Sequence, residues 1–142
     1  MFNAAGDRGS ATLELLVLTP ALLLTIAAAA IGMRIEIAGG AVEAASYDAA
    51  RAASISRDAD TAYTNALSSA QSTLSEQNLH CSQLTVTVDT SGFSIPVGQP
   101  ANVVASVTCV VNLADITAAG MPGSKTMTST SISPLDRYRA RQ

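Results

Sequence analysis

Large side chains and charges are scarce in this sequence. It has no tryptophan, 4% aromatic residues and 13% charged residues. The low charge content and the net charge of −3 argue against a disordered polar chain and against a nucleic-acid partner, which would need a basic surface. Few large side chains are available for a deep core or an enclosed pocket. We therefore expect no small-molecule substrate and no enzymatic activity.

Groups that carry out chemistry are equally sparse. His80 is the only histidine, so a histidine-based metal site cannot form, and no glycine-rich phosphate loop follows a strand pattern. A dyad of His80 with the neighbouring Cys81 is a weak candidate, because adjacent residues seldom aim their side chains at one point. We expect no metal and no cofactor.

The apolar content comes from small residues and from one long run. Of the 142 residues, 26 are alanine, 16 serine and 14 threonine. The uncharged run LLVLTPALLLTIAAAAIGM covers Leu15 to Met33. As a helix rising about 1.5 Å per residue, it is about 28 Å long, close to the hydrocarbon thickness of a bilayer. It predicts a single membrane span, with a buried core helix as the alternative that the rest of the chain is too poor in large residues to cover.

The residues before this run fit an ordinary signal peptide poorly. Asp7 offsets Arg8 in the starting segment, although Ala28 and Ala30 offer a small-residue cleavage site. Glu14 stands at the opening of the apolar run. Insertion scales give about 2.5–3.5 kcal/mol for an Asp at a helix centre in lipid, and less near the interface. A carboxylate kept at that cost points to a function.

The alanine-rich segment after the run predicts a continuation of the same helix. It has no proline between Ala21 and Gln77, and its apolar residues recur at three- and four-residue steps. That stripe consists of Ile55, Ala59, Ala62, Tyr63, Ala66, Ala70 and Leu74. The simplest prediction is one long helix, embedded in a membrane over residues 10–33 and amphipathic over residues 34–79.

The period of the sequence then changes, which predicts a small exposed β domain over residues 80–142. Leu84, Val86 and Val88 alternate with polar residues, as in a half-buried strand. A second strand places Val103, Ala105, Val107, Cys109, Val111 and Leu113 on one face. A third, weaker strand covers about residues 126–132, before a solvated tail. The predicted fold class is α+β, a long N-terminal helix followed by a small antiparallel sheet.

Cys81 and Cys109 are the two cysteines of the chain. In a segment expected outside the cytoplasm, two cysteines predict a disulfide first. The alternative is a pair of buried free thiols. Neither reading is catalytic, because the sequence has no C-x-x-C pair.

The segment RGSATLELLVLTP resembles the processing site of type IV prepilins. That resemblance implies cleavage by a prepilin peptidase after Gly9, which ends a leader over residues 1–9, so that Ser10 begins the mature chain. It also implies a role for Glu14, whose carboxylate would neutralise the N-terminal ammonium of a neighbouring subunit. Pairing removes two unmatched charges from an apolar helix bundle. The alternative is an ordinary anchor with a chance Glu at its boundary.

Residues 8–53 as a whole resemble the TadE-like family of minor pseudopilins from tight-adherence (Tad/Flp) pilus systems. Besides Gly9 and Glu14, the similarity includes Pro20 within the apolar run and the stretches GAVEAA and AARAA at residues 40–45 and 49–53. Family members often have an aromatic residue directly after the Glu, where this chain has Leu15.

Membership of that family implies a minor pilin that helps initiate or prime filament assembly. Its partners would be the membrane, crossed once, the prepilin peptidase, other major and minor pilins and the pilus assembly platform. Its place would be the bacterial cell membrane, with the C-terminal domain outside the cytoplasm, or a surface pilus. Two alternatives stay open: a secreted binding or adhesion module behind a signal peptide cleaved after about Ala30, and a single-pass subunit of another envelope complex.

Overall fold

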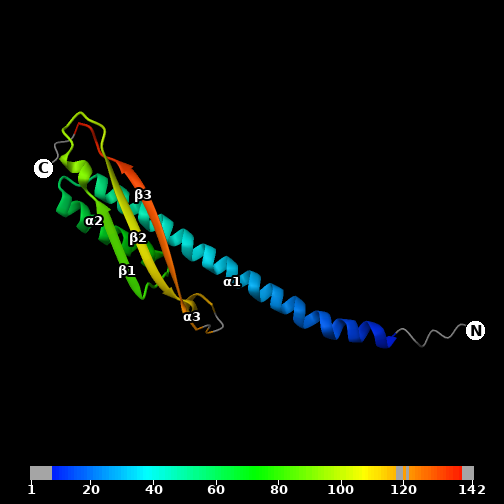
Figure 1. Cartoon of the computed structure of the whole chain (residues 1–142). Helices are drawn as coiled ribbons and strands as arrows, with labels where there is room; N and C mark the ends of the chain where they lie inside the picture. The colour runs from blue at the N-terminus through cyan, green and yellow to red at the C-terminus, as the bar shows by residue number, and fades with distance from the viewer. Residues whose placement is uncertain (1–7, 118–119, 121, 139–142) are drawn as a thin grey trace, which may run out of the picture. The chain divides into compact units, whose positions relative to one another are not determined.

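The computed structural model describes residues 8–117, 120 and 122–138, with side chains from Leu15 onward. Contacts within the chain divide it into two compact units, Met1–Arg34 and Ile35–Gln142. Helix α1 (Arg8–Ser54) begins in the first unit and ends in the second (Figure 1). The second unit adds helix α2 (Ala59–Glu76) and three strands. The α+β class predicted from the sequence is confirmed.

The predicted single helix through residue 79 is wrong, because α1 ends at Ser54 and α2 begins at Ala59. Serine hydroxyls compete for the carbonyls of the last turn, where Ser54 Oγ bonds to the Arg51 carbonyl at 2.8 Å. Asp58 then starts a new helix as its N-cap, in an extended backbone conformation. Its carboxylate accepts the Thr61 N–H at 2.8 Å and the Thr61 hydroxyl at 2.8 Å. Local hydrogen bonds therefore override the continuous apolar period.

Helix α2 ends in a hydrogen-bonded turn at Asn78 and Leu79. Asn78 has a positive φ of 54°, the left-handed conformation that Asn tolerates better than most residues. The Leu79 N–H returns to the Leu74 carbonyl and the Asn78 N–H to the Ser75 carbonyl, both at 3.0 Å. This Schellman arrangement turns the chain out of the helix and toward the sheet.

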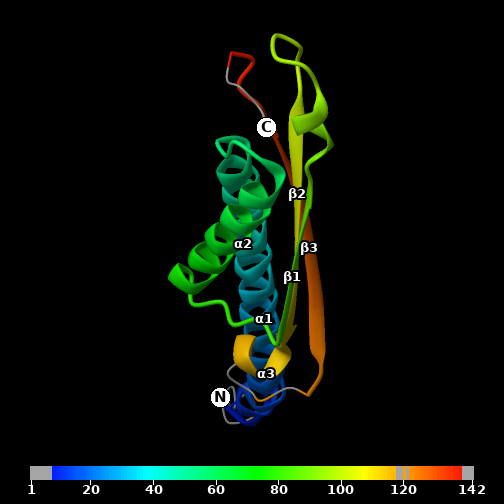
Figure 2. The same ribbon diagram turned by 90° about the vertical axis from the view of Figure 1, so that its left-hand side faces the viewer.

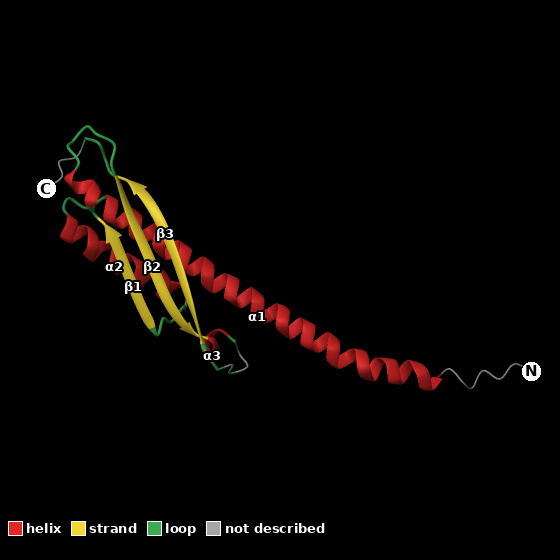
Figure 3. Ribbon diagram, in the orientation of Figure 1, coloured by secondary structure: helices red, strands yellow, loops and turns green. Residues whose placement is uncertain are grey.

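The sheet consists of β1 (Gln83–Asp89), β2 (Asn102–Asn112) and β3 (Ser124–Pro134), antiparallel in the order β1-β2-β3 (Figure 3). The first two strands lie where the alternating pattern predicts them. The third extends beyond the predicted residues 126–132 at both ends. The short helix α3 (Leu113–Ile116) follows β2 and takes up Leu113, which the sequence placed on the strand.

A 3-10 turn, η1 (Ser91–Ser94), begins the connection from β1 to β2. Gly92 is required there, because a Cβ at this position would clash with the carbonyl oxygen of Asn102. The connection passes through Pro96, Gly98 and Pro100, the loop residues expected from the sequence.

The second part of α1, from Ile35 to Ser54, and helix α2 lie together on one face of the sheet (Figure 2). The core between these two layers is built largely from alanine and valine. From α1 it receives Ala38, Ala41, Val42, Ala45, Ala49, Ala50 and Ala53, and from α2 Ala62, Ala66, Ala70 and Leu74. From β2 it receives Val103, Ala105, Val107, Cys109 and Val111. The predicted stripe of α2 is thus buried at four positions, whereas Ile55 and Tyr63 are exposed.

Serines join α1 to β3 inside this core. Ser46 is fully buried, and its hydroxyl lies 2.8 Å from the Glu43 carbonyl, 3.1 Å from Ser129 Oγ and 2.8 Å from Ser131 Oγ. Near the end of α1, Ser133 Oγ donates to Ser54 Oγ at 3.0 Å. Small side chains let the helix approach the strand closely, and their hydroxyls satisfy one another where water is excluded.

The other face of the sheet carries hydroxyl and β-branched side chains in rows across the strands. Thr85, Thr108 and Thr128 form one row, and Thr87, Ser106 and Thr130 form the next. The hydroxyls of Thr108 and Thr128 lie 3.0 Å apart, and Thr130 donates to Ser106 at 3.0 Å. Such cross-strand pairs stabilise a sheet modestly, by about 0.2–1 kcal/mol each.

The serine contact gives a first prediction. Ser46→Val adds volume at a fully buried position and removes the hydroxyl, so we expect the free energy of unfolding to fall by about 1–3 kcal/mol. Chemical denaturation of the detergent-purified chain, followed by circular dichroism, measures this change. The matched control is Ser68→Val on the exposed side of α2, which should change stability by about 0.5 kcal/mol or less. Equal effects of the two variants would contradict the close approach of α1 and β3.

Candidate functional site: the apolar helix and the disulfide-closed unit

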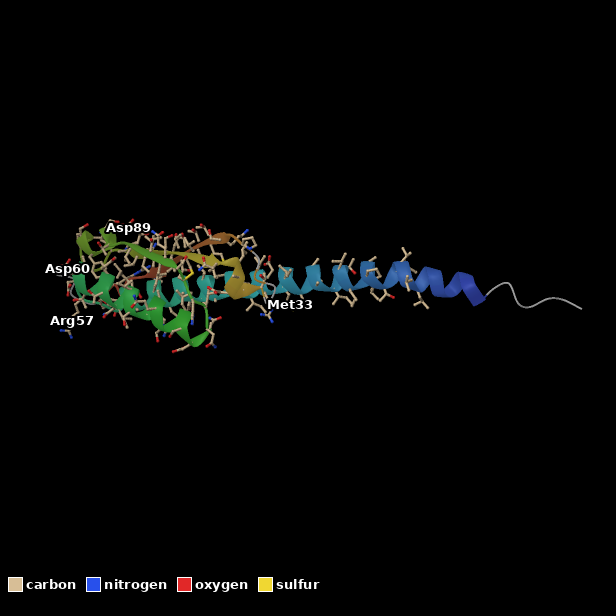
Figure 4. The ribbon with its side chains drawn as sticks, turned by 90° about the horizontal axis from the view of Figure 1, so that it is seen from below. Met33, Arg57, Asp60 and Asp89 are labelled. Atoms are coloured by element: carbon tan, nitrogen blue, oxygen red, sulfur yellow. A yellow bond between two sulfur atoms is a disulfide. The ribbon has the colours of Figure 1, made fainter. Side chains whose placement is uncertain are left out.

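The described part of the first unit is helix, and no described residue covers its apolar side chains from Leu15 to Ala30. Every side chain from Leu15 to Ala30 is exposed, including Leu16 at 75% and Leu24 at 71%. Figure 4 shows these side chains projecting around the helix as far as Met33. A contiguous apolar surface of this kind marks a membrane or protein interaction.

One helix in the described part of the chain is long and apolar enough to cross a membrane, by length and composition. It lies near the N-terminus, where a signal sequence satisfies the same criterion. In its first part, Thr19 and Thr25 donate their hydroxyls to the backbone carbonyls of Leu15 and Leu22, at 2.6 and 2.7 Å. These bonds satisfy the only polar side chains between Leu15 and Met33 without water, which suits an apolar medium.

The residues of the expected processing site lie at the start of α1. Gly9, Ser10 and Glu14 fall within the helix bounds. The structure does not describe the side chains of these residues. It therefore does not place the Glu14 carboxylate. Within the described residues, no group of three or more His, Cys, Asp or Glu side chains is placed to hold a metal ion.

Cys81 and Cys109 form a disulfide, with their Cα atoms 5.4 Å apart. The bond links the residue two positions before β1 to the middle of β2, and Cys109 is fully buried. Beside it, both the N–H and the hydroxyl of Ser82 donate to the Val110 carbonyl, at 2.7 and 2.9 Å. The disulfide predicted first is therefore present, and the free-thiol alternative is wrong. It also leaves no thiol for a dyad with His80.

An open groove of about 510 Å³ lies between α1 and α2 in the second unit. Asp48 from α1 and Asn65, Thr73 and Glu76 from α2 are among its lining residues. Asp48 accepts the Thr73 hydroxyl at 2.8 Å, which ties the two helices together across the groove. Short hydroxyl side chains make up much of the remaining lining, and these give the groove no reactive group.

Among the described residues, two aspartates have a pKa below the ordinary value of 3.8, and each accepts a backbone hydrogen bond from a residue that follows it. The backbone N–H of Thr61, followed by its hydroxyl, lowers the pKa of Asp58 by stabilising the carboxylate. The backbone N–H of Ser91 is the main cause of the lowered pKa of Asp89. Both carboxylates are exposed, and each fixes the local backbone conformation through the hydrogen bond that it accepts.

Comparison of the chain with family models, curated proteins and solved structures finds no match. The functional conclusion therefore depends on the residues and on their arrangement in this chain.

The Asp58 cap predicts a pH effect on stability. Because its folded pKa is lowered, the carboxylate stabilises the fold above its unfolded pKa, and this contribution is lost as the pH falls through the folded pKa, below 3.8. Asp58→Asn keeps an acceptor for Thr61 without this titration. Melting curves from pH 7 to pH 2 should thus fall less steeply for Asp58→Asn than for the wild type. The control is Asp60→Asn, at a carboxylate that caps nothing in the described chain, and identical pH profiles for wild type and Asp58→Asn would contradict the capping role.

The disulfide predicts a larger effect. Closing a span of 28 residues stabilises the fold by about 3–4 kcal/mol in the chain-entropy model. The double variant Cys81→Ala/Cys109→Ala should lose about that amount in chemical denaturation. A reducing agent should destabilise the wild type similarly and leave the variant unchanged. Unfolding of the wild type that is insensitive to reduction would overturn this assignment.

Proposed function

We propose that this chain is a minor pilin (pseudopilin) of a Tad-type pilus or a related secretion system. In this role it is cut after Gly9 by a prepilin peptidase and helps to initiate or prime a filament. The observation that carries the proposal is the fully exposed apolar helix from Leu15 to Ala30, which begins directly after Glu14. A helix of this kind needs either lipid or other helices around it, and a pilin meets both, first in the membrane and then in the filament.

The position of Glu14 supports an assembly role rather than simple anchoring. A carboxylate at the mouth of an apolar helix is costly in lipid unless a cation pairs with it. Cleavage after Gly9 creates a new ammonium group at Ser10, on the same helix and in every copy. Pairing Glu14 of one copy with the Ser10 ammonium of the next removes both costs at the moment of assembly.

The alanine-rich stretches that carry the family resemblance have a structural role in this chain. Ala41, Val42, Ala45, Ala49 and Ala53 all lie in the core under the sheet. This part of α1 supports the exposed unit, and the part before Met33 stays free for other contacts. These two roles of α1 fit a subunit that is anchored by the N-terminal part of the helix and folded around its C-terminal part.

A second candidate is a secreted binding or adhesion module released after about Ala30. It is favoured by one observation, that Ile35–Gln142 forms a compact unit by itself. The N-terminus of the protein recovered from its native membranes separates the candidates. Mass spectrometry should find a chain beginning at Ser10, whereas a start near Ile31 would support the secreted module and an intact Met1 an ordinary envelope anchor.

Two variants test the proposal in cells. Gly9→Phe should abolish maturation, because a bulky side chain blocks approach of the peptidase to the backbone, whereas Gly6→Phe in the same leader should be processed normally. Glu14→Ala should be processed normally but should fail to enter filaments, measured as pilus number by electron microscopy. Normal maturation of Gly9→Phe, or normal pilus number with Glu14→Ala, would contradict the proposed function.

A further inference from the structure

The sheet has two free edges, and the hydrogen-bond pattern shows which residues are directed outward along each. Two bonds next to the β2–β3 ladder fix its phase: Leu135 N–H to the Ala101 carbonyl at 2.8 Å, and Leu113 N–H to the Gly123 carbonyl at 3.0 Å. In an antiparallel pair, hydrogen-bonded residues alternate with residues whose backbone groups point away. The odd-numbered residues of β3 therefore bond to β2. The outward backbone groups belong to Thr126, Thr128, Thr130 and Ile132.

The same alternation assigns the edge of β1. The odd-numbered residues of β2 face β3, so the even-numbered ones, Ser106 and Thr108 among them, face β1. Their partners Thr87 and Thr85 use their backbone groups inside the sheet. Leu84, Val86 and Val88 are left with outward N–H and C=O groups. Within the described residues, no hydrogen bond reaches the outward groups of either edge.

The β3 edge lacks the usual protection against pairing. From Thr126 to Ser133 it carries no charge and no proline, with Lys125 and Pro134 only at its ends. Native proteins commonly protect a free edge with charges, prolines or bulges, because an exposed strand is a template for another chain. An 11-residue edge rich in threonine is suited to backbone pairing.

The direction of the side chains restricts how a second copy can add to this edge. On β3 the outward residues carry side chains on the threonine face, whereas on β1 the outward residues Leu84, Val86 and Val88 carry theirs on the helix-covered face. Parallel pairing aligns an outward residue of one strand with an inward-bonded residue of the next, on the same face. A parallel β3–β1 contact therefore keeps the helices of both copies on one side of the sheet. An antiparallel β3–β1 contact would put them on opposite sides.

The strand directions within one copy also favour a parallel β3–β1 contact. Strands β1 and β3 both run antiparallel to β2 and so run parallel to each other. Two copies inserted into one membrane in the same sense, as the proposed function requires, therefore present β3 and β1 to each other in parallel. Charge repulsion does not disfavour this contact. Lys125 lies at the start of β3 and Asp89 at the end of β1, and they have opposite signs, so no like charges meet.

We propose that the β3 edge binds the β1 edge of a second copy of this chain as a parallel strand, with Thr128 beside Thr85 and Thr130 beside Thr87 of the next copy. The pairing continues the threonine rows from one copy to the next. Because the two surfaces differ, the contact is head-to-tail and adds subunits without closing into a pair. This inference extends the proposed function from anchoring to ordering of copies.

Disulfide crosslinking in native membranes tests the contact. The variant Thr85→Cys/Thr128→Cys cannot bridge within one copy, because these residues are two strand spacings apart, about 9–10 Å, and a disulfide needs Cα atoms within about 7 Å. Mild oxidation should give a ladder of dimers, trimers and larger species on non-reducing gels. Each single variant should give no ladder. Dimers from Thr128→Cys alone would indicate β3–β3 pairing and would overturn the proposal, as would the absence of crosslinks in the double variant.

Proline variants separate edge pairing from folding. Thr126→Pro/Thr130→Pro removes two outward N–H groups and leaves the β2–β3 ladder bonds intact, so the fold should persist while the ladder of crosslinks is lost. Ser129→Pro is the matched control, since it removes a donor to β2 and should unfold the sheet. A ladder that survives the two edge prolines would contradict backbone pairing. The proposed function is judged separately, by the N-terminus at Ser10 and by recovery in membranes, so either conclusion can fail alone.

Discussion

The burial of α1 is the constraint on which the rest of the structure depends. Over its second part, the helix packs against the sheet through alanine and serine, which bring the backbones close but bury little apolar area per residue. Over its first part, leucine and isoleucine stay exposed. The large apolar side chains of α1 are therefore placed where no described residue covers them, and the small ones where the sheet does. That distribution is the reverse of a self-sufficient globular protein, and it makes external contacts part of the design.

The second unit compensates for its thin core in several ways. The serine contacts between α1 and β3 satisfy polar groups inside the core, and Asp48 and Thr73 hold the two helices together. The disulfide fixes the start of β1 to β2, where side-chain burial alone is modest. Phe93, the only buried phenylalanine in the described chain, packs near the turn at which Gly92 allows close backbone approach. Apart from the packing of Phe93, these contacts stabilise the fold without a large hydrophobic side chain.

Much of this architecture could be predicted from the sequence, because it depends on local periods. Alternation over Leu84–Val88 and Val103–Val111 located two strands, since a half-buried strand has a strict period of two. The break between α1 and α2 was missed, because the apolar stripe runs on through Ile55. The helix ends there through local hydrogen bonds of two serines, Ser54 and Ser56, and of the capping Asp58. The Asp58 signal, three residues before Thr61, was available in the sequence. The α1–β3 serine contacts were not predictable, because they join residues 79 to 85 positions apart. The roles of Gly9, Ser10 and Glu14 stay predictions.

The disulfide also makes the stability of the chain depend on its redox environment. Thiols stay reduced in the cytosol and oxidise in extracytoplasmic compartments. The Cys81–Cys109 bond limits the conformations of the unfolded chain, so the fold is more stable under oxidising than under reducing conditions. Under the function proposed above, this bond would form only after the second unit has left the cytosol. The β1 edge proposed to bind the next copy would then be fixed to β2 only in the compartment where copies assemble.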